Sequence, residues 1–396
     1  MINEYINYGF GFLKYVPNID DKNKEKEQIK EKKSNSMDYP FSTYLQQNPR
    51  RTNRNESIYL ETPMYYDFSL GEPVIDIDIG NKNQSSSFRV ILDTGSTVLL
   101  VSGAECEVCP RNKGIFKPNF GQKIQDSFGT ITYNGGQKTD YELWNTQFPQ
   151  LNYANGIVGV AIDSTLALDD HQSNYQIKSN NGVMTGSPIN PSRHENLLGL
   201  NSTGFIQSLP QDVPRSVIFD FPQGQFIMGK SLNDFIESDL RNRRHSSLFK
   251  TLAKGPSDHP FIVSPVHRMT VDGVEVPKNI SPQWVLFDTG STRSVYPKSL
   301  YQWINKVHPT SSRTPATVTF DFEVDNTVSK RKSKKVDPIV TETIDMLLKN
   351  EDISIDDPPS LPIHKTILLG NRQLKRHGIG FEFNPNGMSG QLLFFV

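Results

Sequence analysis

The sequence predicts an all-β chain made of two related lobes, and three observations support this prediction. An apolar run followed by Asp-Thr-Gly-Ser-Thr occurs twice, at residues 90–97 and 285–292. Strand-like segments separated by turns fill much of the chain, and its 26 Pro and 27 Gly suit short strands better than long helices. A Leu-Leu-Gly segment follows each copy of the motif, at residues 197–199 and 368–370.

Each copy of the repeated motif has the pattern of a buried strand that ends at an acid, Asp93 or Asp288. A glycine two residues later lets the chain turn and brings backbone N–H groups close to the carboxylate. The hydroxyl groups of Thr and Ser can hold that carboxylate in place. One Asp-Thr-Gly would be ordinary turn chemistry, but two identical pentapeptides indicate an internal duplication.

Three segments are expected along the chain. Residues 1–62 form a polar, Lys-rich segment that is either a disordered tail or a removable prosegment, with a dibasic cleavage candidate at residues 48–51. Residues 63–245 are predicted to form the first lobe and residues 246–396 the second. Mixed charge at residues 230–250 suggests the junction between them.

Within the first lobe, residues 74–79 alternate with the period of a strand. Residues 131–136 predict a β-hairpin with a Gly-rich tip. Its Tyr133 could close over a cleft as lids do, although spacing alone favours a plain hairpin with a half-buried tyrosine. The polar residues 169–195 predict a surface insertion. In the second lobe, the basic run 330–335 is interpreted as a solvated loop rather than a nucleic-acid site.

Composition excludes several other classes of protein. The formal net charge of −1 gives no reason to expect binding to nucleic acid, and no run of 18 apolar residues predicts a transmembrane helix. The first 16 residues lack the basic segment of an ordinary signal peptide, which leaves an upstream start, unconventional export or an internal location. The two cysteines, Cys106 and Cys109, are too few for a structural zinc site, so we favour a small disulfide loop over two reduced thiols.

Two acids brought close together in a low-dielectric cleft cannot both ionise, so such a pair shares a proton. The charged acid can take a proton from a water molecule while the protonated acid polarises a carbonyl group. The chain lacks the H-E-x-x-H, G-x-S-x-G, P-loop and G-x-G-x-x-G motifs of competing chemistries. The sequence therefore favours hydrolysis of an amide by water, without a metal or cofactor.

From about residue 65 onward the chain resembles the pepsin-family (A1-type) aspartic endopeptidases. The resemblance rests on the two Asp-Thr-Gly copies, the Leu-Leu-Gly segments and Ile131-Thr132-Tyr133, in the order of the family. It implies a bilobal pepsin-like fold with the active site in a cleft between the lobes. It also implies a monomer that acts on peptide or protein substrates, works best in acid and is blocked by statine-type inhibitors. Asp93 and Asp288 would be the catalytic pair.

The resemblance also assigns supporting roles around the two acids. Ser96 and Ser291 match hydroxyls that bond the acids, and Thr94 and Thr289 match those that brace the two loops. The residues matched to catalytic-loop support are Thr94, Gly95, Ser96, Thr289, Gly290 and Ser291, and those matched to substrate binding and the flap are Tyr133, Gly135 and Ile91.

Further matches concern the segments around these loops. Leu197-Leu198-Gly199 and residues 367–370 match segments packed beside the catalytic loops, and residues 156–159 compete for the first of these roles. Residues 197–199 are preferred because the sequence that follows them also resembles the family. Cys106 matches the first cysteine of the family's small disulfide loop.

Some residues depart from the family pattern. Leu100 replaces the Trp that usually bonds the flap tyrosine, and Arg293 stands where an aliphatic residue is common. Arg293 suggests a preference for acidic or polar substrates, although a solvent-facing Arg is the simpler interpretation. The family implies a secretory, vacuolar or extracellular location, but its second and third disulfides are missing here. A catalytically inactive peptide-binding protein on the same fold is the alternative function.

Overall fold

The protein is described from a computed structural model. The described residues are 60–67, 72–81, 83–95, 98–107, 109, 114–132, 138–151, 153–164, 178–179, 182–183, 197–200, 205–241, 243, 245–254, 260–309, 314–323, 341–349, 353–355, 365–385 and 389–396. Within them the fold is mostly β-sheet with few helices, as the all-β prediction requires.

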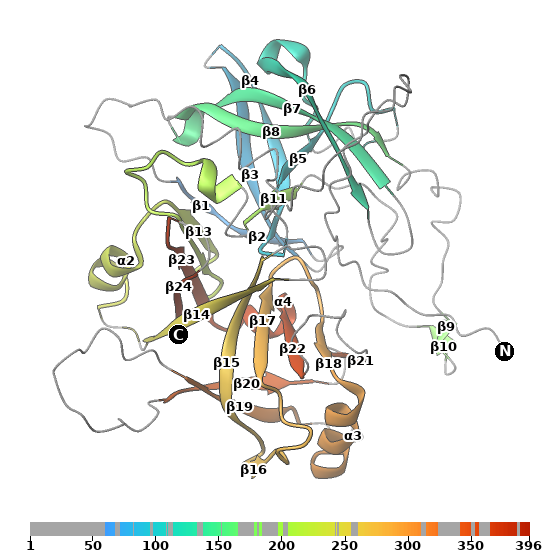
Figure 1. Ribbon diagram of the computed structural model, residues 1–396, viewed down its shortest axis with the longest axis vertical. Coiled ribbons are helices and arrows are strands. Elements are labelled where there is room, and N and C mark those ends of the chain that lie inside the picture. The colour runs from blue at the N-terminus through green and yellow to red at the C-terminus, as the bar shows by residue number, and fades with distance from the viewer. Residues whose placement is uncertain are drawn as a thin grey trace, which may run out of the picture.

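Among these described residues, one sheet of eight strands holds the first copy of the motif, and most of it lies in the upper part of Figure 1. Its strands, in spatial order, are β2 (Tyr65–Asp67), β3 (Glu72–Asn81), β4 (Gln84–Asp93), β11 (Leu197–Gly199), β5 (Leu99–Ser102), β8 (Tyr153–Ser164), β7 (Lys138–Phe148) and β6 (Gly121–Thr132). Short 3-10 helices lie at Pro118–Phe120, Pro149–Leu151 and Phe205–Ser208.

In the part of the chain that the structure describes, a second sheet of fourteen strands holds the second copy. Its main path is β1 (Leu60–Pro63), β13 (Gln225–Met228), β12 (Ser216–Asp220), β23 (Gly378–Phe383), β24 (Ser389–Phe395), β14 (His245–Lys254), β15 (Pro260–Val271), β17 (Trp284–Asp288), β22 (Thr366–Gly370), β18 (Ser294–Tyr296) and β21 (Ile353–Ile355). Attached to β15 are β16 (Val274–Glu275) and β19 (Ala316–Glu323), and β20 (Thr341–Leu348) pairs with β19.

The remaining elements are short. Among the described residues, the α-helices are α2 (Leu232–Ser238), α3 (Lys298–Val307) and α4 (Asn371–Leu374), and a small hairpin is formed by β9 (Lys178–Ser179) and β10 (Gly182–Val183). Helix α2 begins after Ser231, whose hydroxyl accepts a hydrogen bond from the Asp234 N–H at 3.0 Å. Such a cap satisfies one of the free N–H groups of the first turn.

The duplication seen in the sequence is repeated in the order of the strands. In the first half the order is β3-β4-β11-β5-β8, and in the second it is β15-β17-β22-β18-β21. The strand that carries the acid pairs in parallel with the Leu-Leu-Gly strand in both halves. The Leu-Leu-Gly strand then pairs antiparallel with the next strand, and a parallel pair follows. The two halves are therefore built on one plan.

The larger sheet takes strands from both sides of residue 245, the boundary that the sequence suggested. Strands β1, β12 and β13 precede that residue, yet β12 pairs with β23, which lies near the end of the chain. In Figure 1, β1, β13 and β23 lie left of centre, between the eight-stranded sheet above and β15 to β22 below. This arrangement links the beginning and the end of the described chain through one sheet.

The core is continuous from one sheet into the other. A single cluster of buried apolar side chains includes Leu92 and Leu99 of the eight-stranded sheet together with Phe287 and Leu369 of the larger one. The ring of Phe287 packs against three other phenylalanine rings, with the nearest centroid, that of Phe394, 5.6 Å away. Because Phe287 directly precedes Asp288, this packing fixes where β17 delivers its acid.

Of the other predictions from the sequence, the structure describes some in part and leaves others outside the described residues. Strands β6 and β7 form the predicted hairpin, with Thr132 opposite Lys138, while the tip at residues 133–137 lies outside the described residues. The basic run 330–335 also lies outside them, and the insertion at 169–195 is described only at β9 and β10.

One buried ion pair joins β12 to the segment that follows α2, and its removal should destabilise the fold. Arg243 donates to both carboxylate oxygens of Asp220, at 2.6 and 3.1 Å, and Asp220 is only 3% exposed. Arg243→Met leaves that carboxylate buried without its partner and is expected to lower the free energy of unfolding by about 3 kcal/mol.

The exposed pair of Arg89 and Asp76 gives a matched control for this measurement. Arg89→Met should change the free energy of unfolding by less than about 1 kcal/mol, because water screens that pair. Denaturant titration of both variants compares the two pairs, and equal losses would contradict the assignment of a structural role to Arg243.

Candidate active site

Both acids of the repeated motif end a buried strand beside a parallel neighbour. Asp93 ends β4 and lies opposite Gly199 of β11, and Asp288 ends β17 and lies opposite Gly370 of β22. The backbone N–H of Leu200 donates to the carbonyl oxygen of Asp93 at 2.7 Å, which holds the first turn against the Leu-Leu-Gly strand. Residues 197–199 therefore form the strand beside the first acid. Residues 156–159 do not, because they belong to β8, which is not a neighbour of β4.

Two buried threonines join the two turns by reciprocal hydrogen bonds. The Thr94 N–H donates to Thr289 Oγ1 at 3.1 Å, and the Thr289 N–H donates to Thr94 Oγ1 at 3.0 Å. Each hydroxyl then donates across to the other strand, from Thr94 to the Phe287 carbonyl at 3.1 Å and from Thr289 to the Leu92 carbonyl at 2.8 Å. The four bonds have two-fold character and tie together turns that are far apart in the sequence.

The glycines that follow these threonines let the two carboxyl groups meet. A Cβ atom placed on Gly290 would lie 2.3 Å from Asp93 Oδ1, and one placed on Gly95 would lie 2.9 Å from Asp288 Oδ1. Either contact is far too short for a real side chain, so each acid occupies the space that a larger residue in the other turn would need. That same point above Gly95 lies 3.1 Å from Asp93 Oδ1, so the Oδ1 atoms of the two acids are at most 2.9 + 3.1 = 6.0 Å apart.

Hydrogen bonds from the turns hold both carboxyl groups. The Gly95 N–H donates to Asp93 Oδ1 at 2.7 Å, and the Gly290 N–H donates to Asp288 Oδ1 at 3.0 Å. The Ser291 hydroxyl also donates to Asp288 Oδ2 at 2.7 Å. The orientation of Asp288 is thus set by bonds to both of its oxygens.

The two acids differ in their surroundings. Asp288 is only 6% exposed, whereas Asp93 is half-buried. Burial, followed by the negative charge of Asp93, raises the pKa of Asp288 to about 8. A hydrogen bond with Asp93 acts in the same direction, because the protonated Asp288 carboxyl donates to the Asp93 carboxylate. The two acids therefore share a proton, and Asp288 keeps it to a pH above the ordinary range of an Asp.

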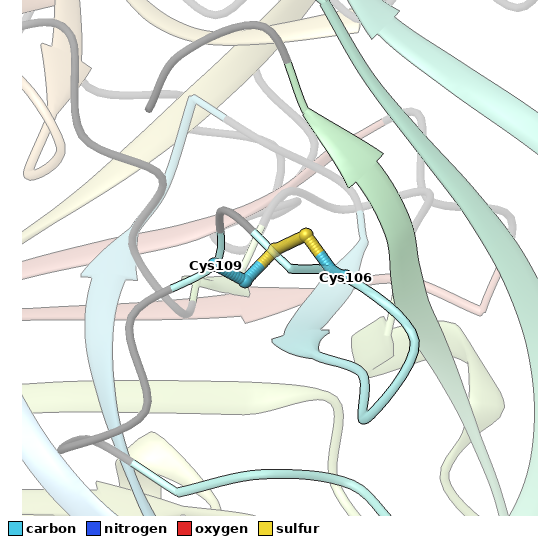
Figure 2. Close-up of a disulfide and its surroundings, with 2 residues drawn as sticks. All are labelled: Cys106 and Cys109. Carbon is cyan, nitrogen blue, oxygen red and sulfur yellow. A yellow bond between two sulfur atoms is a disulfide. The ribbon is translucent and has the colours of Figure 1, made fainter. Parts of the chain in front are cut away.

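The disulfide lies in the loop after β5, beyond the first acid. The sulfur atoms of Cys106 and Cys109 are 2.03 Å apart, as the prediction of a small disulfide loop required (Figure 2). Both cysteines are buried and pack with Val98, Leu100 and Ala161 in a small apolar cluster separate from the main core. Leu100 is thus a packing residue in this cluster.

The remaining candidate residues are placed as follows. Ile91 is buried in β4, paired with Val74 on one side and Leu197 on the other. Arg293, in the turn after Asp288, is half-buried. Ser96, Tyr133 and Gly135 lie outside the described residues, so their predicted roles stay predictions.

A buried amide beside the second acid was not anticipated from the sequence. The side chain of Asn371 donates from Nδ2 to the Thr289 carbonyl at 3.3 Å, and its backbone N–H donates to the Ser291 carbonyl at 2.8 Å. Asn371 directly follows the second Leu-Leu-Gly, which is the signal that could have revealed it.

Comparisons with known proteins leave the site to be interpreted from its own geometry. No protein-family model matches the chain, and no curated protein matches it. Among the described residues, no helix is long and apolar enough to cross a membrane. In the same part of the chain, no group of three or more His, Cys, Asp or Glu side chains is arranged to hold a metal ion.

The threonine bonds should contribute strongly to stability. Thr289→Val keeps the side-chain shape but removes the acceptor of the Thr94 N–H and the hydroxyl that donates to the Leu92 carbonyl, so we expect a loss of about 2–4 kcal/mol in the free energy of unfolding. Thr289→Ser keeps the hydroxyl and should lose only about 1 kcal/mol. Denaturant titration compares the two variants, and similar losses would show that the methyl group matters more than the bonds.

The raised pKa of Asp288 should make the fold less stable as pH rises. Its folded-state pKa lies above the ordinary value of 3.8, so the folded state binds the proton more tightly and stability declines between about pH 4 and 8. Asp288→Asn removes this dependence, and its stability relative to the wild type should increase with pH by at most about 1.4 kcal/mol per pH unit. Denaturant titration at several pH values tests this expectation.

The Asp93→Asn background provides the control for that measurement. It removes the negative charge that helps to raise the pKa of Asp288, so the gain from Asp288→Asn should become smaller there. A stability difference between wild type and Asp288→Asn that is flat with pH would contradict the proposed titration of Asp288.

Proposed function

We propose that this protein is an aspartic endopeptidase of the pepsin type, with a bilobal fold and its catalytic pair at Asp93 and Asp288. The observation that carries the proposal is the close approach of two carboxyl groups across the two turns. The pKa of one of them, the buried Asp288, is raised to about 8, above the ordinary range of an Asp. The repeated strand order and the reciprocal threonine bonds support the proposal, because they present the two acids from equivalent turns.

The chemistry follows from the unequal charges of the pair. A water molecule held between the carboxyl groups gives a proton to the Asp93 carboxylate and attacks the carbonyl carbon of a peptide bond. The protonated Asp288 donates to the carbonyl oxygen as negative charge develops there. Collapse of the tetrahedral intermediate returns a proton to the leaving amine, and no covalent bond to the protein forms. The reaction uses only the two acids and water.

The supporting residues have distinct parts in this scheme. The Gly95 and Gly290 N–H groups and the Ser291 hydroxyl fix the carboxyl planes, so little reorganisation is needed during the reaction. The intact acids and their hydrogen bonds favour catalysis over the alternative of a non-catalytic peptide-binding protein, which has no need of a pair that shares a proton.

Hydrolysis of an unbiased peptide mixture between pH 3 and 9, followed by mass spectrometry, tests the proposal. Asp93→Asn and Asp288→Asn are each expected to lower kcat/KM by at least about 100-fold, because each removes one partner in proton transfer. Asp76→Asn, an exposed acid on the neighbouring strand β3, is the matched control and should leave activity unchanged. Binding of peptides without cleavage by the wild type would favour the alternative function.

The same assay tests the shared proton. Activity requires the pair to hold one proton, so kcat/KM should fall as pH rises through about 8, where Asp288 loses it. A profile that falls by pH 5, as the acid optimum implied by the family resemblance would give, would contradict the charge state assigned to the pair, whereas a profile that extends to neutral pH would agree with it.

A further inference from the structure

The residue that follows each Leu-Leu-Gly segment has the same place in the two halves but different chemistry. Leu200 follows the first segment and Asn371 the second, and both are fully buried. Their backbone N–H groups hold the neighbouring turns, at the carbonyls of Asp93 and Ser291 respectively. Asn371 adds a side-chain donor and Leu200 does not, so the two halves of the site differ in chemistry at this equivalent position.

The Asn371 amide reaches Asp288 through a single peptide group. Its Nδ2 donates to the carbonyl oxygen of Thr289, and that carbonyl shares its peptide group with the N–H of Gly290. The Gly290 N–H in turn donates to Asp288 Oδ1 at 3.0 Å. A donor on the carbonyl side of a peptide polarises the group and strengthens the bond made by its N–H.

We propose that Asn371 is a positioning residue that orients and strengthens the Gly290 N–H bond to Asp288, and that Leu200 gives Asp93 no equivalent support. This inference rests on the proposed function, since it assigns a role in the same pair of acids. It explains why a polar amide is buried beside the more enclosed acid.

Few charged groups surround Asp288, so an effect of Asn371 on the pKa of Asp288 can be measured. Asp93 is the charged side chain that acts on Asp288. Strand β22 carries no ionisable side chain, and β17 carries none except Asp288 itself. Arg293 in the turn and Arg372 in α4 are the cationic residues of the adjoining segments and remain unchanged in the variants below.

The direction of the effect follows from the bonds. The Gly290 N–H stabilises ionised Asp288 and so opposes the rise of its pKa. If Asn371 loses its amide, that bond weakens and Asp288 keeps its proton to a higher pH. The alkaline limb of kcat/KM should then move upward, while KM should change by less than about twofold because the buried side chain does not reach substrate.

The test compares Asn371→Leu, which copies the first half of the site, with a matched control. Gln373 is an equally buried amide two residues along, but it bonds to the Tyr296 hydroxyl rather than to the catalytic turn. Gln373→Leu should lower stability without moving the pH profile. Asn371→Leu should move the alkaline limb up by about half a pH unit. Asn371→Ala, which cannot overpack the site, serves if the Leu variant does not fold.

A second measurement separates this inference from the proposed function. The pH dependence of the free energy of unfolding reports Asp288 without any need for activity, and it is measured for wild type and for the Asn371 variant. In the variant, the loss of stability with rising pH should extend to higher pH. In the Asp288→Asn background, the two proteins should show the same pH dependence.

The outcomes are distinct. A wild type without peptidase activity would overturn the proposed function. The unfolding measurement would still show whether Asn371 strengthens the Gly290 N–H bond to Asp288. If the wild type is active and a folded Asn371 variant keeps the same alkaline limb and the same pH dependence of unfolding, the role proposed for Asn371 is overturned and the proposed function is not. An equal shift in Gln373→Leu would also overturn that role, because the effect would then be general to buried amides in this region.

Discussion

The hydrogen bonds between Thr94 and Thr289 are the constraint on which the site depends. Each acid comes from a different sheet, and nothing within either turn alone would bring the carboxyl groups together. The threonine side chains bond to the backbone of the opposite strand, so the separation of the two turns is fixed by buried bonds rather than by surface contacts. The continuous apolar core behind them, with Phe287 packed among other phenylalanine rings, holds the strands that supply these bonds.

Near-symmetry at the backbone level coexists with inequality of the two acids. The two glycine N–H bonds are alike, yet Asp288 is more enclosed than Asp93. Differences of this kind let identical side chains take opposite protonation states, which acid–base chemistry with a pair of carboxyl groups requires. The symmetric turns bring the two carboxyl groups close together, and the unequal burial of the two acids makes one of them keep the proton.

The sequence predicted much of this arrangement because a duplicated motif can be recognised within a single sequence. The all-β class, the Leu-Leu-Gly strands beside the acids and the disulfide between Cys106 and Cys109 all agree with the structure. Sheet membership was not predictable, since the pairing of β12 with β23 depends on contacts between distant segments that share no pattern. The buried contacts of Asn371 were missed for a related reason, because an Asn after Gly is also ordinary turn chemistry.

The pairing of early with late strands has a consequence for how the molecule is made. Strand β1 lies on the same sheet as β23 and β24, and Thr94 finds its partner only in the second half of the chain. Contacts at such long range form slowly and leave strand edges uncovered while the ribosome is still adding residues. The emerging first half would therefore remain without its second acid until the second half of the fold has been made, so the proposed peptidase would be inactive during that time.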